Sequence, residues 1–438
     1  MLVLNKINVG NNRKAGSLVK SNVAVHPEAI GTPANCHFTL ASFFKSKNSI
    51  KPKSPYIYHL LSHQFIYQKT MNKLINKINT FCFSLENRLG LLASCLIIGL
   101  IILGFDMLYI TPKFELAYHW LQYSILSNNP FDFTTTIFVR YRILPSFLGY
   151  ITFLRGNLFV VVPLIFSLLF ISAVYYMYRK KKYVPVDALL FTGLIAFSCT
   201  LYIQLTAPGY TDTAFYFFIF LSFAFISNVF KSALFFALAL LTHESCLFLL
   251  PGLLFYAYYV SFYKKDILKY LLAYSISIIP LLLYRNWVSG HVHVEFDLDF
   301  YFSEKNIHFA MKRVLPLIPA GAFYAFKLFW FFPIYAMYKS WQRKEYKFII
   351  LISIILICNF AQLAIAFDIT RMLCLGFPAI LLSAEKIKTS WSSSRFTKFA
   401  LGLTLINFLI LQNYVSADGL IPMLPLPYTS LVNFLVGI

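Results

Sequence analysis

The chain has 438 residues, of which 59% are hydrophobic and only 13% are charged, and its formal net charge is +21. Soluble proteins carry roughly 25% charged and 45–50% apolar residues, so this composition excludes a soluble globular protein. Apolar runs of about 20 residues recur along the chain, which is typical of a polytopic membrane protein. The seven cysteines show no paired spacing, and we expect them to pack as small hydrophobic residues, with neither a disulfide framework nor a zinc site.

The first 70 residues differ from the remainder of the chain. They hold nine Lys or Arg residues, one acidic residue and no sustained hydrophobic period. Two interpretations are open. Residues 1–70 could be a disordered basic tail in the cytoplasm, or sequence upstream of a true start at Met71, where a short basic stretch leads into the first apolar run. In both cases the sequence predicts a transmembrane domain over residues 71–438.

The apolar runs after Met71 predict an all-α, polytopic transmembrane helix bundle of about 11 spans (10–12). The runs lie at 90–110, 157–178, 186–206, 212–228, 231–243, 245–262, 268–287, 316–337, 347–366, 370–384 and 398–415. At 1.5 Å per residue the run 231–243 is too short to cross, so it could form a re-entrant hairpin with the run that follows. Two long loops, 111–156 and 288–315, are expected to carry short helices on the outer face, and 419–438 could lie at the membrane interface.

Basic residues sort to one side of the predicted bundle. If every run crosses, the clusters at 179–182, 264–269, 339–347 and 386–398 share one side, which carries 19 basic and 5 acidic residues after Met71. The opposite side carries 9 basic and 10 acidic residues. The positive-inside rule makes the basic side cytoplasmic, together with the N-terminus. The net charge therefore follows from topology and the tail, and no nucleic-acid partner is needed to explain it.

The first outer loop contains the sequence's first candidate site residues. Glu115 and Asp132 are isolated carboxylates, and Arg140 and Arg142 open the stretch RYRILPSFLGY. Apolar residues recur at helical spacing in this stretch, which predicts a short amphipathic helix on the membrane surface. The two arginines could clamp a phosphate in bidentate fashion. They could equally snorkel to lipid headgroups.

Three further polar features lie where apolar runs begin or end on the outer side. Asp212 follows a Pro-Gly turn and could either cap a helix or place a carboxylate at a cavity mouth. His243 and Glu244 are flanked by apolar runs, so they face either a bundle interior or a tight exposed hairpin. Asp368 and Arg371 are spaced i,i+3, and they could pair locally or bind a lipid-linked phosphate. Lys327 lies in the middle of an apolar run and could point into the cavity at whose mouth Asp212 would lie.

The second outer loop contains an alternating segment, HVHVEFDLDF, at residues 291–300. If it is extended, its two His and three acidic residues share one face. Such an edge could hold a divalent metal ion. The alternative is an amphipathic strand whose polar face lies in water, so the sequence establishes no metal ligand.

This arrangement resembles the GT-C superfamily of multi-span membrane glycosyltransferases. The resemblance covers about residues 71–415 and rests on five short motifs. They are a long first outer loop with acidic residues, Arg140-x-Arg-x-Leu-Pro145, Tyr210-Thr-Asp212, Thr242-His-Glu244 and Asp368-x-x-Arg371. The chain departs from the family in one respect, because no acidic pair follows its first span. Only the isolated Glu115 and Asp132 stand there, with Asp106 at the end of the span.

The resemblance implies transfer of a sugar from a polyprenyl-phosphate-linked donor to a glycan, lipid or protein acceptor. It implies a catalytic role for Glu115 or Asp132. Arg140, Arg142, Asp212, His243, Glu244, Asp368 and Arg371 would then bind substrate. The expected location is the plasma membrane, as in the bacterial inner membrane, with membrane lipids as partners. A polysaccharide polymerase or lipid-glycan ligase follows the same logic. A transporter of a lipid or small solute is the non-enzymatic alternative, but the sequence shows no repeated halves.

Overall fold

The computed structural model describes residues 55–109, 118–133, 138–207, 209–261, 266–292 and 303–423. Side chains are described from Lys69 onward, apart from those of residues 118, 119 and 138. The chain divides into two compact units, Met1–Leu74 and Ile75–Ile438. Within the first unit the described backbone is helical from residue 55, so the last part of the predicted tail forms a helix.

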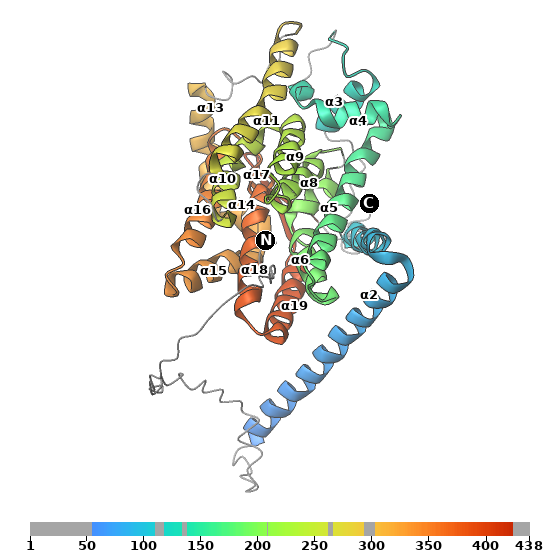
Figure 1. Ribbon diagram of the computed structural model, residues 1–438, viewed down its shortest axis with the longest axis vertical. Coiled ribbons are helices and arrows are strands. Elements are labelled where there is room, and N and C mark those ends of the chain that lie inside the picture. Colours follow the sequence, from blue (N-terminus) through green and yellow to red (C-terminus); the bar gives the residue numbers. More distant parts are fainter. Residues whose placement is uncertain are drawn as a thin grey trace, which may run out of the picture. The chain divides into compact units, whose positions relative to one another are not determined.

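The described chain is predominantly helical, which confirms the all-α prediction (Figure 1). Its α-helices are α2 (Pro55–Tyr109), α3 (Tyr118–Asn128), α4 (Ile143–Ile151), α5 (Val161–Lys180), α6 (Pro185–Ala196), α7 (Cys199–Thr206), α8 (Asp212–Ala224), α9 (Val229–Thr242), α10 (Leu250–Val260), α11 (Asp266–Ser289), α13 (Glu304–Phe309), α14 (Ile318–Phe326), α15 (Phe331–Gln342), α16 (Tyr346–Ala361), α17 (Ile369–Leu373), α18 (Phe377–Ser390) and α19 (Ser393–Leu409). Short 3-10 turns connect several of them, at Phe138–Tyr141, Gly156–Val160, Glu244–Leu249, Leu315–Leu317, Lys327–Trp330, Gln362–Ala364 and Cys374–Gly376, and Ala310–Val314 is a π-helical turn.

Five helical stretches in the described residues are long and apolar enough to cross a membrane. They are Lys69–Tyr109, Gly156–Lys180, Asp266–Ser289, Glu304–Gln342 and Tyr346–Ala364. The pair α6 and α7, bent by 54°, adds a sixth if it forms one broken span. The multi-pass character predicted from the sequence is therefore supported, but the count of about 11 spans is not confirmed.

The described residues hold fewer candidate spans than the sequence predicted because several apolar runs fold into short helices. Helices α8, α9 and α10 contain 13, 14 and 11 residues. At 1.5 Å per residue each is about 20 Å long or less, against a hydrocarbon core of about 30 Å. Helices α8 and α9 form a hairpin in which the Ser222 and Ser232 hydroxyls each donate to the other residue's carbonyl oxygen, at 2.9 and 2.7 Å. The apolar composition of this part of the sequence therefore gives no sign of the turn between α8 and α9.

The helices of the second unit pack in a closed circuit of neighbours. In order, α5, α8, α9, α11, α10, α16, α15, α18 and α6 each contact the next, and α6 contacts α5. Large aromatic side chains on these helices, such as Tyr175, Phe191 and Phe236, are fully buried. Close packing of these helices holds the polar groups at the ends of the short helices in fixed positions.

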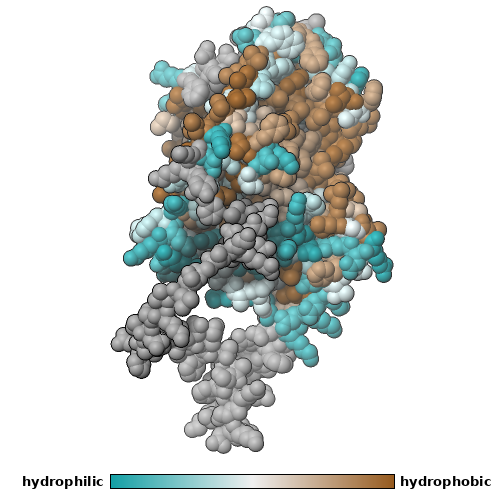
Figure 2. Space-filling model, in the orientation of Figure 1, coloured by the Kyte–Doolittle hydropathy of each residue, from teal (hydrophilic) through white to brown (hydrophobic). Residues whose placement is uncertain are grey.

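Ion pairs link charged residues on neighbouring helices of the second unit. Nine ion pairs link described residues, and in each pair the sequence assigned both residues to the same side. On the basic side, Lys181 binds Glu385 and Lys388 binds Asp187, which joins α5, α6 and α18. Figure 2 shows hydrophilic residues gathered at the lower end and hydrophobic residues over much of the visible face above it.

A β-hairpin follows the last helix, where the sequence predicted that a span continues to residue 415. Strand β1 (Gln412–Ser416) pairs antiparallel with β2 (Gly419–Met423), with Gln412 opposite Met423 and Ser416 opposite Gly419. Gly419 has φ of +125°, a conformation that glycine adopts without strain, so the tight turn is possible here. Helix α19 consequently ends at Leu409, and the prediction of an apolar span over 410–415 is wrong.

Lys327 interrupts the helical stretch 304–342 and does not point toward the outer-side candidates. Its backbone adopts φ of +48°, between α14 and α15. The ammonium group donates to the carbonyl oxygens of Asn407 and Ile410, at 3.2 and 2.7 Å, at the end of α19. A buried cation that satisfies helix C-terminal carbonyls has a structural explanation.

Candidate functional site

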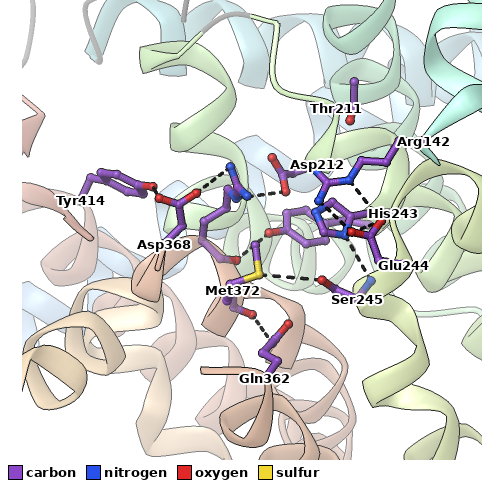
Figure 3. Close-up of polar contacts among 12 residues, drawn as sticks. Arg142, Thr211, Asp212, His243, Glu244, Ser245, Gln362, Asp368, Met372 and Tyr414 are labelled. Carbon is purple, nitrogen blue, oxygen red and sulfur yellow. Dashed lines mark hydrogen bonds and ion pairs between the residues drawn. The ribbon is translucent and has the colours of Figure 1, made fainter. Parts of the chain in front are cut away.

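Six of the predicted substrate-binding residues lie in one cluster of charged side chains (Figure 3). We call this set the polar cluster: Arg142, Asp212, His243, Glu244, Asp368 and Arg371. Four separate segments supply it, namely the residue before α4, the first residue of α8, the break after α9, and the start of α17. Each segment lies where a helix begins or ends, so the side chains project from helix termini and do not interrupt the packed helices.

Arg142 and Glu244 form a bidentate ion pair. Arg142 Nε donates to Glu244 Oε2 at 3.2 Å, and Nη2 donates to Oε1 at 3.0 Å. Burial alone raises the pKa of Glu244, but Arg142 and His243 lower it by more, so the net shift is downward and the carboxylate stays ionised. A carboxylate bound in this way is a strong ligand for arginine and a weak proton acceptor.

His243 ends α9 and turns the chain into the next helical segment. It adopts an extended backbone conformation, and its Nδ1 accepts a hydrogen bond from the Ser245 amide at 3.2 Å. Its ring stacks on Phe215 of α8 with centroids 5.4 Å apart. The side chain is almost fully buried, so the sequence alternative of an exposed hairpin does not hold for His243.

Arg371 lies between two carboxylates. Its Nη1 is 2.9 Å from Asp368 Oδ2, and its Nε is 3.6 Å from Asp212 Oδ1. The guanidinium also lies over the Tyr210 ring, 4.7 Å from the centroid, and its backbone carbonyl accepts a hydrogen bond from the Tyr216 hydroxyl. Burial lowers the pKa of Arg371, but Asp368 and Asp212 raise it by more, so the group stays charged.

Asp212 connects the two arginines electrostatically. Its side chain is nearly fully buried at the first residue of α8. Burial raises its pKa, whereas Arg371 and Arg142 both act to lower it, and the net shift is upward. Thr211 stands at the N-cap position of α8 and makes no side-chain cap hydrogen bond, while the Asp212 carboxylate faces Arg371.

Tyr414 is the contributor that sequence reasoning missed. Its hydroxyl donates to Asp368 Oδ1, and it reaches this position from strand β1. Nothing in the local sequence distinguishes it from the other 28 tyrosines, because its role depends on a hairpin that the apolar pattern concealed. Tyr210 was visible only as part of the Tyr-Thr-Asp motif.

Arg140, which the resemblance placed among the substrate-binding residues, lies outside the polar cluster, as does Asp132. Arg140 is buried under the Phe133 ring, 4.9 Å from its centroid, and its carbonyl accepts a hydrogen bond from Tyr284 of α11. Burial lowers its pKa, while Tyr284 and Asp132 act in the opposite direction. Asp132 is exposed. Arg140 and Arg142 are therefore only two residues apart at a 3-10 turn, but their side chains lie in different surroundings. Glu115 lies outside the described residues.

A metal ion receives little support from the part of the chain that the structure describes. Those residues contain no group of three or more His, Cys, Asp or Glu side chains suited to hold one. Of the alternating segment 291–300, only His291 and Val292 are described, and His291 Nδ1 lies 2.7 Å from the Trp287 carbonyl oxygen. The predicted ligands at positions 293, 295, 297 and 299 lie outside the described residues.

An open depression of about 420 Å³ lies at the basic end, lined by Tyr259, residues 344–348 and Lys386. None of its lining residues belongs to the polar cluster, whose convergent charges identify it as the better candidate.

Comparison with known proteins adds no relative. No family model, no curated protein and no solved structure matches the chain.

Proposed function

We propose that the chain is an integral-membrane glycosyltransferase of the GT-C kind, which transfers a sugar from a polyprenyl-phosphate-linked donor to an acceptor on the outer face. The acceptor would be a glycan, lipid or protein in cell-envelope glycan or glycolipid assembly. One observation carries the proposal. Arg142 and Arg371, from segments far apart in the chain, converge with the carboxylates of Asp212, Glu244 and Asp368 at the end opposite the basic residues.

Arg371 retains donor capacity for a phosphate. Arg371 Nε and Nη1 are buried and lie within ion-pair distance of carboxylates, yet among the described acceptors neither meets one in hydrogen-bonding geometry. Buried polar atoms are normally satisfied, so such an atom indicates a ligand or a rearrangement. The planar guanidinium fork matches two phosphate oxygens, as an ammonium group does not.

The charge balance limits how an anion can bind. Two arginines face three carboxylates, so the polar cluster carries one excess negative charge when all three carboxylates are ionised and His243 is neutral. The upward shift in the pKa of Asp212 favours its protonated form, which would balance the charges. Asp368 and Glu244 have side chains 25% and 27% exposed, against 6% and 10% for Arg371 and Arg142. A phosphate would therefore exchange with a carboxylate to reach a guanidinium.

The membrane arrangement fits the same proposal. By the positive-inside rule the basic end lies in the cytoplasm and the polar cluster lies toward the outer face, where a prenyl-linked phosphate would sit at the interface. Glu115 or Asp132 would act as general base, since Glu244 is committed to Arg142. A polymerase or lipid-glycan ligase would use the same headgroup contacts.

The test compares two lipids that share one tail. The purified protein in nanodiscs is titrated with undecaprenyl phosphate and with undecaprenol. We expect the phosphate to bind at least about tenfold more tightly, since charge-assisted hydrogen bonds contribute about 1.5–3 kcal/mol each. Arg142→Gln should remove most of this difference, and Arg313→Gln, which removes an exposed charge assigned to the same side, should retain it. Equal binding of the two lipids by the unchanged protein would refute the proposal.

A further inference from the structure

The β-hairpin is bound to the segment that carries Asp368 and Arg371. The Val415 amide donates to Thr370 Oγ1 at 2.9 Å, and the Ala417 amide donates to the Phe367 carbonyl oxygen at 2.9 Å. Tyr414 lies next to these two anchors, and its hydroxyl donates to Asp368 Oδ1. Strand β1 therefore runs beside residues 367–370, and backbone contacts fix where the Tyr414 side chain can reach.

We propose that Tyr414 is a positioning residue, which holds the Asp368 carboxylate in an orientation that leaves the Arg371 guanidinium able to receive an anionic headgroup. The proposal rests on the proposed function for its ligand, but its geometric content stands on the contacts themselves. Asp368 Oδ1 accepts the hydrogen bond from Tyr414, and Asp368 Oδ2 lies 2.9 Å from Arg371 Nη1, so the tyrosine and the arginine approach different oxygens of one carboxylate.

Loss of the Tyr414 hydroxyl would change how the two Asp368 oxygens are shared between Tyr414 and Arg371. Oδ1 would lose a donor, and rotation of the carboxylate would let both oxygens face the guanidinium. A bidentate carboxylate pair is stronger than a single contact and occupies two of the donors that a phosphate needs. Burial and the neighbouring Asp368 raise the pKa of Tyr414, so its hydroxyl keeps its proton and remains a donor. The Tyr414 hydroxyl of the hairpin thus weakens the Asp368–Arg371 ion pair, which a ligand must displace.

The position of Arg371 is fixed from other directions as well. The Tyr216 hydroxyl of α8 donates to its carbonyl oxygen at 2.9 Å, and the Tyr210 ring lies beside its guanidinium. The arginine therefore cannot simply follow Asp368, and the orientation of the carboxylate decides how strongly the two groups pair. This separates a positioning role for Tyr414 from a general contribution to folding.

The first experiment needs no ligand. The coupling between Asp368→Asn and Arg371→Gln is measured from thermal unfolding in detergent, once in the unchanged protein and once with Tyr414→Phe present. We expect a larger Asp368–Arg371 coupling when Tyr414→Phe is present, because the carboxylate then turns fully to the arginine. A merely structural hydroxyl would lower stability without changing this coupling. An unchanged or smaller coupling overturns the inference.

The second experiment measures undecaprenyl phosphate affinity in nanodiscs. Tyr414→Phe should weaken binding by about 3–10-fold, in keeping with one altered hydrogen bond to a charged group, and should have no effect when Asp368→Asn is present. Tyr109→Phe is the matched control, since its hydroxyl donates to the Phe408 carbonyl oxygen at 2.7 Å and to no residue of the polar cluster. Normal affinity in Tyr414→Phe overturns the inference. If the unchanged protein binds no phosphate lipid, the proposed function fails, and the coupling experiment still decides the role of Tyr414.

Discussion

Arg142 and Glu244 lie 102 residues apart in the chain, and two hydrogen bonds of 3.2 and 3.0 Å join their side chains. The pair links the segment that begins α4 to the break that ends α9. Since Glu244 follows His243, which stacks on Phe215 of α8, this one contact orders three of the segments around the polar cluster.

The first prediction concerns this pair. Arg142→Gln should destabilise the fold by about 2–3 kcal/mol, because hydrogen bonds to charged groups contribute about 1.5–3 kcal/mol and the partner carboxylate is left partly buried. Glu244→Gln should have a similar effect. The double change should cost less than the sum of the two single changes. Unfolding in detergent measures all three, and strictly additive effects would show that the two residues do not interact.

A second prediction concerns Gly209, in the turn before Asp212. Its φ is +101°, and a Cβ atom placed there would lie 2.3 Å from the Trp120 side chain. Gly209→Ala should therefore destabilise the fold by at least about 1–3 kcal/mol and should displace Tyr210 from Arg371. Gly402→Ala is the control, because a Cβ there meets nothing within 4 Å. A melting temperature for Gly209→Ala equal to that of the control would contradict the strained turn.

The orientation of the bundle gives a third prediction. Asn129 and Lys181 are both exposed, and the sequence assigns them to opposite sides. In intact cells a membrane-impermeant thiol reagent should label Asn129→Cys, and it should label Lys181→Cys only after the cells are opened. The described native cysteines are buried or half-buried, which favours low background labelling. The reverse pattern would place the polar cluster in the cytoplasm and end the lipid-donor argument.

The general base gives a fourth prediction. Glu115→Gln and Asp132→Asn preserve side-chain shape and remove basicity, so the variant of the true base should lose sugar-transfer turnover by about 10²-fold or more. Asp132 is exposed and influences Arg140, so Glu115 is the slightly favoured candidate. Near-normal turnover in both variants would move the base elsewhere, with Asp212 as the next candidate.

The long apolar runs predicted the fold where hydropathy and helix length agree. The runs at 157–178, 268–287 and 347–366 correspond closely to helical stretches that could span a membrane. The runs at 212–228 and 231–243 did not, because Asn228 caps the start of α9 and the Ser222 and Ser232 hydroxyls join α8 to α9 across a turn, so the two runs form a hairpin of short helices. The hairpin at 412–423 was missed because apolar residues suit a strand as well as a helix.

The site was predictable to the extent that charge at helix ends is rare and costly in a membrane protein. Glu244 was singled out on that ground, and Arg142, Asp212 and Arg371 were singled out from short local motifs; the structure brings the four together. Arg140 looked equivalent to Arg142 in the sequence, but a 3-10 turn directs it toward Phe133 and Tyr284. Tyr414 carried no such signal, because its contact with Asp368 depends on tertiary structure.

The most direct test of the central claim is the affinity of Arg371→Lys for undecaprenyl phosphate in nanodiscs. The substitution keeps the positive charge and removes the guanidinium fork, so the account predicts clearly weaker binding, by about tenfold, in a protein that still folds. The competing account, in which Arg371 only tethers α17 through Asp368, predicts little change. Affinity equal to that of the unchanged protein would contradict the claim that Arg371 binds the donor phosphate.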